Sequence, residues 1–227
     1  VEHGAMVYLR YSVARDPTPT MAAQHRSELR GGKMTVETMI AAQTRIELQT
    51  AARCASVSLD AQCANQFQSY VNNTLGFEQM RFGWMYGTEK AVARSSDDAE
   101  KEASNAPAIE VHAIYEPEQE GAADRFSLKK NGEEDARADA LASSLGLKKV
   151  GMVFNVSTSA ARDYTLSAFE VRTMAECQAR YGPTFVTAVV MMLEDEDEDG
   201  EVTKSVSFEP FQVSEQCVRL FTDGWFA

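Results

Sequence analysis

The residues best suited to chemistry in this sequence are its cysteines and histidines, and their spacing favours structural roles. The four cysteines are Cys54, Cys63, Cys177 and Cys217; none forms a C-x-x-C pair, and none has a histidine at zinc-finger spacing. This spacing predicts no structural zinc site. A Cys/His nucleophile would need His112, which falls within a predicted strand. We therefore expect a structural histidine, and core thiols at Cys177 and Cys217, which lie on apolar faces of predicted helices.

A run of acidic residues, EDEDEDGE at 194–201, is the strongest charge feature and a candidate cation site. Asp195, Asp197, Asp199 and Gly200 match the first half of a calcium-binding loop, D-x-[DN]-x-[DN]-G. The bidentate glutamate belongs at position 206, which is Val206. The flanking residues are typical of strands, whereas a calcium loop lies between helices. We expect a solvated, self-repelling turn in preference to a calcium site or a recognition tail.

Composition excludes several classes of function. The chain has 227 residues, of which 44% are hydrophobic, and a net charge of −12, so it can bury roughly 70% of its unfolded surface in one sizeable core. The acidic balance argues against nonspecific binding to nucleic acid or to an anionic membrane. The longest apolar stretch, 185–193, is too short to insert into a bilayer. Few scattered cysteines indicate a reducing compartment, nucleus or cytosol.

The elements that must position any site follow from periodicity and cap signals. Helical spacing and stop signals predict helices over 60–75, 133–145, 167–181 and 214–221. Ser167 and Glu170 form a capping box at the start of the third helix. The apolar spacing in the second helix assigns Ala138, Leu141 and Leu145 to its inner face.

Strand patterns lie between these helices. They predict strands over 80–87, 108–115 and 149–156, and a hairpin of 184–193 with 202–213 whose turn is the acidic run. An acidic loop is expected after Pro117, and a charged insertion over 91–106. The alternation predicts an α/β domain, a mixed β-sheet flanked by helices. No G-x-S-x-G, P-loop or G-x-G-x-x-G motif is present, so these patterns alone identify no activity.

Six segments together resemble one family. They occur in the family's order and span about Val57 to Cys217: RFGWMYG (81–87), VHAIYEPEQEG (111–121), LGLKKVGMVF (145–154), LSAFEV (166–171), TFVTAV (184–189) and FEPFQVSEQC (208–217). The sequence is therefore similar to the nuclear protein localisation factor four family, a ubiquitin-binding cofactor of the valosin-containing AAA ATPase. The resemblance implies the MPN fold of the JAMM zinc deubiquitinases.

The resemblance also locates the positions of a JAMM zinc site, which needs a glutamate base, an H-x-H pair and an S-x-x-D element. By motif, the base position falls on Met80 and the imidazole positions on Phe154 and Val156. The S-x-x-D element falls on Ser167 and Glu170, for which the capping box is a sufficient explanation. Because base and imidazoles are missing, the resemblance implies a degenerate site with no metal, no cofactor and no peptidase activity.

A stretch at 157–165, between the two degenerate motifs, corresponds to the insertion that touches ubiquitin in JAMM enzymes. The resemblance makes Asp163 and Tyr164 the candidate ubiquitin contacts. The alternative is that the stretch is a surface loop with no binding role. In the family a groove takes an unfolded ubiquitin; its residues stay unassigned here.

The resemblance implies a division of the chain at residue 56 and a set of partners. Residues 1–56 are a remnant of the region preceding the MPN domain, without its zinc-finger ligands, and residues 57–227 are the MPN-type domain. Expected partners are ubiquitin chains, the ATPase and the ubiquitin fusion degradation factor, in cytoplasm and nucleus or peripherally at the endoplasmic reticulum. The alternatives are an MPN scaffold subunit of another ubiquitin-linked assembly and a divergent JAMM metallopeptidase.

Overall fold

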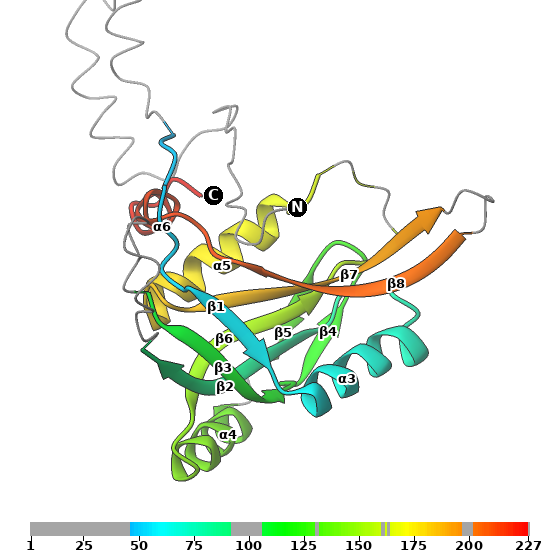
Figure 1. Ribbon diagram of the computed structural model, residues 1–227, viewed down its shortest axis with the longest axis horizontal. Coiled ribbons are helices and arrows are strands. Elements are labelled where there is room, and N and C mark those ends of the chain that lie inside the picture. Colours follow the sequence, from blue (N-terminus) through cyan, green and yellow to red (C-terminus); the bar gives the residue numbers. More distant parts are fainter. Residues whose placement is uncertain are drawn as a thin grey trace, which may run out of the picture.

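A six-stranded mixed sheet lies at the centre of the computed structural model, which describes residues 46–91, 106–129, 132–159, 162, 164–196 and 202–226 (Figure 1). The strand order is β1-β3-β2-β6-β7-β8; β1/β3 and β6/β7 are parallel, and the other neighbours are antiparallel. The strands are β1 Ser56–Leu59, β2 Phe82–Lys90, β3 Ala108–Tyr115, β6 Lys148–Asn155, β7 Val186–Glu196 and β8 Val202–Phe211. The predicted α/β class with a mixed sheet is confirmed.

The two faces of the sheet carry two separate apolar clusters. Phe82, Trp84 and Tyr86 of β2 belong to one cluster, while Met85, between them, belongs to the other. Successive side chains of a strand point to opposite faces, so a continuous apolar run indicates a strand covered on both sides. At the end of β2's central run, a Cβ on Gly87 would lie 1.9 Å from the Glu110 carbonyl oxygen, where the β2–β3 register shifts.

Helices cover both faces. The Phe82 face is packed by side chains of α4 (Gly132–Ser144), α5 (Ala168–Tyr181) and α6 (Glu215–Thr222). The Met85 face is packed by α3 (Ala61–Ser69) and by a π-helical turn, η1 (Tyr70–Thr74), through Phe67 and Val71. The predicted capping box of α5 is present in full. One face of this helix, with Val171, Met174, Ala175 and Gln178, is buried, and Tyr181 at its end is half-buried.

The predicted inner face of α4 is wrong. Leu141 and Leu145 are 65% and 67% exposed, and Ala142 is the buried residue. Polar contacts set this rotation: Asp139 accepts hydrogen bonds from Tyr86 Oη and Lys149 Nζ, at 2.5 and 3.4 Å. These bonds to the sheet outweigh an apolar stripe that spacing alone identifies.

Short strands escaped prediction. β1 precedes the first predicted helix, at 60–75. The loop expected after Pro117 contains a two-stranded sheet of β4 (Gln119–Gly121) and β5 (Phe126–Leu128). The predicted hairpin is confirmed as β7 and β8. Most of its acidic turn, residues 197–201, lies outside the described residues, as do most of the charged insertion, 92–105, and residues 1–45.

Candidate functional site

The five positions that the resemblance assigns to a degenerate JAMM site lie around the start of β2, the end of β6 and the start of α5. Met80 precedes β2, Phe154 lies near the end of β6, and Val156 follows that strand. Met80 and Phe154 belong to one apolar cluster, against which Val156 packs. Ser167 and Glu170 form the cap and first turn of α5, and the neighbouring Leu166, Phe169 and Val171 belong to or pack against the same cluster.

The residues at the predicted base and imidazole positions are apolar, and two of the three are sealed from water, whereas Val156 is half-buried. Met80 is 1% exposed and Phe154 is fully buried. Phe126 packs tilted against Phe154, with ring centres 6.1 Å apart, and edge-on against Phe169 at 5.2 Å. A phenyl ring donates no lone pair to a metal and a thioether is a soft, weak ligand, so these side chains serve packing.

The carboxylate of Glu170 is buried, and both of its oxygens are already hydrogen-bonded. Oε2 accepts from the backbone N–H of Ser167 at 2.6 Å, and the Glu170 N–H donates to Ser167 Oγ at 3.2 Å. Oε1 accepts from Nη1 of Arg162 at 2.8 Å. Because Glu170 is only 1% exposed, its charge requires such a partner, and a guanidinium satisfies it as a metal would.

Arg162 is the residue of this site that sequence reasoning missed. Its side chain is 15% exposed, and its Nη2 donates to the carbonyl of Thr165 at 2.7 Å. The sequence held one signal for it. Arg162 is a cation eight residues before Glu170, and the capping role of that glutamate predicts that it lies at a half-buried helix start, where its charge needs a partner. Spacing in sequence alone does not say that a loop arginine turns back toward its helix.

Asn155 is a second missed residue, and it fixes the backbone around Met80. Its Oδ1 accepts from Arg81 N at 2.6 Å, and its Nδ2 donates to Gln79 O at 3.0 Å. The side chain is fully buried, so these bonds also satisfy its amide. An asparagine at the end of a predicted strand gives no signal of a partner more than seventy residues away.

The stretch 157–165 is anchored at both ends. Near its start, Ser157 Oγ donates to Glu78 O at 2.8 Å and the Thr158 N–H to Phe77 O, also at 2.8 Å. Near its end, Arg162 holds Thr165 and Glu170. Tyr164 is 53% exposed, and the guanidinium carbon of Arg162 lies 5.4 Å from its ring centre. The other predicted contact, Asp163, lies outside the described residues.

The thiols and His112 show no sign of activation. Burial raises the pKa of Cys177 to about 12 and that of Cys217 to about 11, so both stay protonated near neutral pH and are poor nucleophiles. Cys177 is buried and Cys217 packs against the core, as predicted. His112 lies on the surface of β3, with Nε2 3.9 Å from Glu110 Oε2.

In the part of the chain that the structure describes, no group of three or more histidine, cysteine, aspartate or glutamate side chains is placed to hold a metal ion. Within those same residues no helix has both the length and the apolar character that a bilayer crossing requires.

Comparison with known proteins gives one family. The fold and site define an MPN-like α/β domain, and the sequence model of the NPL4 family matches residues 81–226. NPL4-like protein 1 of Arabidopsis thaliana is 42% identical over 230 residues, covering 99% of this chain and 50% of that protein. The Nuclear protein localization protein 4 homolog of Dictyostelium discoideum is 31% identical over 182 residues, covering 80% of this chain and 27% of that protein.

The chain belongs to the NPL4 family. The human Nuclear protein localization protein 4 homolog is 33% identical over 138 residues, covering 50% of this chain and 21% of that protein. This chain spans about half the length of its Arabidopsis relative. The family resemblance expected from the six sequence segments is therefore confirmed.

Proposed function

We propose that this chain is part of a non-catalytic MPN-domain scaffold that binds polyubiquitinated substrates and recruits them to the valosin-containing AAA ATPase, together with the ubiquitin fusion degradation factor. This role places it in cytoplasm and nucleus, and peripherally at the endoplasmic reticulum during degradation of proteins from that compartment. Membership of the NPL4 family supports the cofactor role, and relatives named for nuclear protein localization support the nuclear component.

The state of Glu170 is the observation that carries the non-catalytic part of the proposal. In a JAMM enzyme the corresponding carboxylate is a metal ligand, whereas here Arg162 and Ser167 N–H occupy its two oxygens. Apolar, buried side chains stand at the base position and at one imidazole position. A zinc-bound water would therefore have neither its ligands nor a general base.

Ubiquitin contact through Tyr164 is the finer part of the proposal. An exposed tyrosine held by a neighbouring guanidinium offers a large contact area at a low cost in side-chain entropy. Arg162, which also donates to the carbonyl of Thr165, holds the tyrosine beside the start of α5.

The test is a binding assay with the full-length protein, purified polyubiquitin chains and the ATPase. We expect the protein to retain intact chains and the ATPase, and Tyr164→Ala to weaken chain binding at least about fivefold without changing ATPase capture. Tyr70→Ala is the matched control, because Tyr70 is 36% exposed and has Arg81 5.3 Å from its ring centre.

The other readings give different results in this assay. Chain binding without ATPase capture would favour a scaffold subunit of another ubiquitin-linked assembly. Zinc-dependent cleavage of the chains would favour a JAMM metallopeptidase. Unchanged binding by Tyr164→Ala would remove the assignment of that residue while leaving the scaffold role in place.

A further inference from the structure

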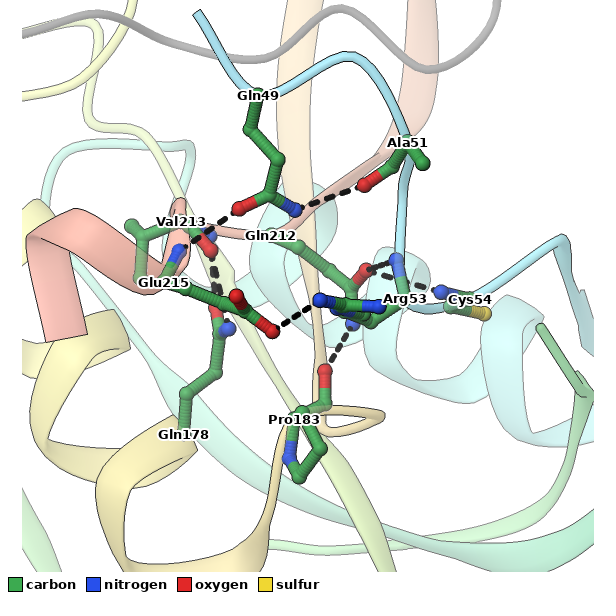
Figure 2. Close-up of polar contacts among 9 residues, drawn as sticks. All are labelled: Gln49, Ala51, Arg53, Cys54, Gln178, Pro183, Gln212, Val213 and Glu215. Atoms are coloured by element: carbon green, nitrogen blue, oxygen red, sulfur yellow. Dashed lines mark hydrogen bonds and ion pairs between the residues drawn. The ribbon is translucent and has the colours of Figure 1, made fainter. Parts of the chain in front are cut away.

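The segment FEPFQVSEQC at 208–217 carries polar residues that the proposed function does not use. Gln212, Glu215 and Gln216 all contact the extended segment 47–54, which precedes β1. In Figure 1 this segment, in light blue, passes beside α6 before it enters the sheet. Figure 2 shows the part of this contact made by Gln212 and Glu215. We call residues 47–54 the strap.

Gln212 is the centre of this contact. Its Oε1 accepts from the backbone N–H groups of Arg53 and Cys54, both at 3.1 Å. Its Nε2 donates to the carbonyl oxygens of Pro183 and Phe185, at 2.9 and 3.2 Å. One amide side chain thus joins the strap to the turn between α5 and β7 (Figure 2).

A second set of contacts joins the strap to the start of α6. The N–H of Glu215 donates to Gln49 Oε1 at 2.8 Å, and the N–H of Glu47 donates to Gln216 Oε1, also at 2.8 Å. Arg53 and Glu215 form an ion pair. The first N–H groups of a helix lack partners within the helix, so Gln49 of the strap supplies one that α6 needs.

The surface that receives the strap is itself held firmly. Gln178 of α5 accepts from the N–H of Val213 at 2.6 Å and donates to the carbonyl of Val213 at 3.1 Å. Both residues are buried, at 6% and 4% exposure. This paired contact fixes the corner between β8 and α6 on α5, so the receiving surface does not depend on the strap for its position.

The strap, by contrast, is weakly buried except at Cys54, its last residue, which is 9% exposed and belongs to the cluster on the Met85 face. It has no regular helix or strand, and Leu48 is 66% exposed. Its described contacts with the corner are mainly hydrogen bonds and one exposed ion pair, and a segment of this kind opens at a small fraction of the free energy of global unfolding.

We propose that the corner formed by Gln212, Glu215 and Gln216 is an intramolecular peptide-binding surface, and that the strap is its releasable occupant. When the strap is bound, Glu47 lies beside the start of α6. When it is released, residues 47–53 remain joined to the domain through Cys54 and β1. In its bound state the strap is part of the folded domain. We therefore place the domain boundary upstream of Glu47 and not at residue 56. This inference does not depend on ubiquitin binding.

The test is amide hydrogen exchange, resolved by residue, on the full chain. We expect the amides of Glu47, Arg53 and Cys54 to exchange at least about tenfold more slowly than in an unstructured peptide, but faster than those of β6. Gln212→Met removes both amide functions at similar side-chain length. We expect it to accelerate exchange of all three strap amides about tenfold and to leave β6 unchanged.

Controls separate strap release from loss of the fold. Gln66→Met, on the exposed side of α3, should change none of these rates. If Gln212→Met does not fold, Gln49→Met acts from the strap and should give the same pattern. Trypsin should cut after Arg53 faster in Gln212→Met and in Gln49→Met than in Gln66→Met. Three results would overturn the proposal. The strap amides could exchange at the rates of an unstructured peptide in the wild type. Their exchange could be unchanged in both variants, or it could accelerate only when exchange of the β6 amides accelerates too.

Discussion

Replacing Arg162 with methionine should destabilise the domain more than a loop substitution ordinarily does. The change removes the guanidinium but keeps an unbranched apolar side chain. Among the described residues it leaves the Glu170 carboxylate, 1% exposed, with the Ser167 N–H as its one remaining hydrogen-bond donor. Breaking a buried ion pair from one side costs about 3–5 kcal/mol, because the remaining charge is uncompensated. At the lower end of that range, the thermal midpoint should fall by about 6–12 °C.

A double-mutant cycle separates this charge effect from lost packing. Glu170→Gln keeps an oxygen that can accept from the Ser167 N–H. It removes the charge that pairs with Arg162, but the Arg162 side chain is 15% exposed and therefore nearer to water than Glu170. We expect it to cost less than Arg162→Met. The double variant should be more stable than the sum of the single changes predicts, by at least about 1 kcal/mol.

Urea denaturation followed by circular dichroism measures these free energies. Arg125→Met is the control, because its ion pair with Asp124 is exposed on both sides, at 67% and 60%, and it should lie within about 0.5 kcal/mol of the wild type. An Arg162→Met variant as stable as this control, or an additive cycle, would refute the view that a guanidinium compensates a buried Glu170 charge.

Three further predictions concern the aromatic and polar contacts of the sheet. Phe154→Ala should lower the free energy of unfolding by about 3–5 kcal/mol, while Leu141→Ala, exposed on α4, should change it by less than about 0.5 kcal/mol. Equal losses in the same denaturation assay would contradict the assignment of α4's outer face. Burial, and then the hydrogen bond to Asp139, raises the pKa of Tyr86 above its ordinary 10.0, so stability should fall as pH rises past about 10, and Tyr86→Phe should flatten that fall in thermal melts against pH. Partial burial opposes ionisation of Asp139, but hydrogen bonds from Tyr86 and Lys149 outweigh it and lower its pKa; its contribution is present above the unfolded pKa of about 3.9 and is lost as pH falls through the lower folded value, so Asp139→Asn should be less acid-sensitive than the wild type.

Sequence reasoning succeeded where a local signal suffices. The capping box of α5 involves only Ser167 and Glu170, three residues apart, and its geometry is local. The hairpin of β7 and β8 follows from two long apolar runs around a charged turn. The six segments identified the family because their order along the chain can be read without knowledge of the fold.

Prediction from sequence failed where a residue distant in sequence determines how a side chain or a helix is oriented. The orientation of α4 depends on Tyr86, more than fifty residues before Asp139, and Asn155 bonds to the backbone around Met80 from the end of another strand. Arg162 is close to Glu170 in sequence, but its direction depends on how the loop folds back. Such contacts override spacing because each satisfies a polar group in a partly or fully dehydrated place.

The contacts of the polar residues at 212–216 could not be predicted from sequence either. Their segment contributed to the family resemblance, yet nothing in its composition indicates that Gln212 and Gln216 receive the backbone of residues 47–54. A glutamine side chain has both a donor and an acceptor and can join two backbone segments. Only the fold, which brings both segments to α6, reveals this role.

The central claim is that the full-length protein binds ubiquitin chains for the ATPase without cutting them. The most direct measurement incubates it with polyubiquitin chains and zinc, captures it through the ATPase, and resolves the ubiquitin on a denaturing gel. The account predicts that chains are captured at full length, with no products of cleavage. Zinc-dependent shortening of the chains, or capture of neither chains nor ATPase, would contradict it.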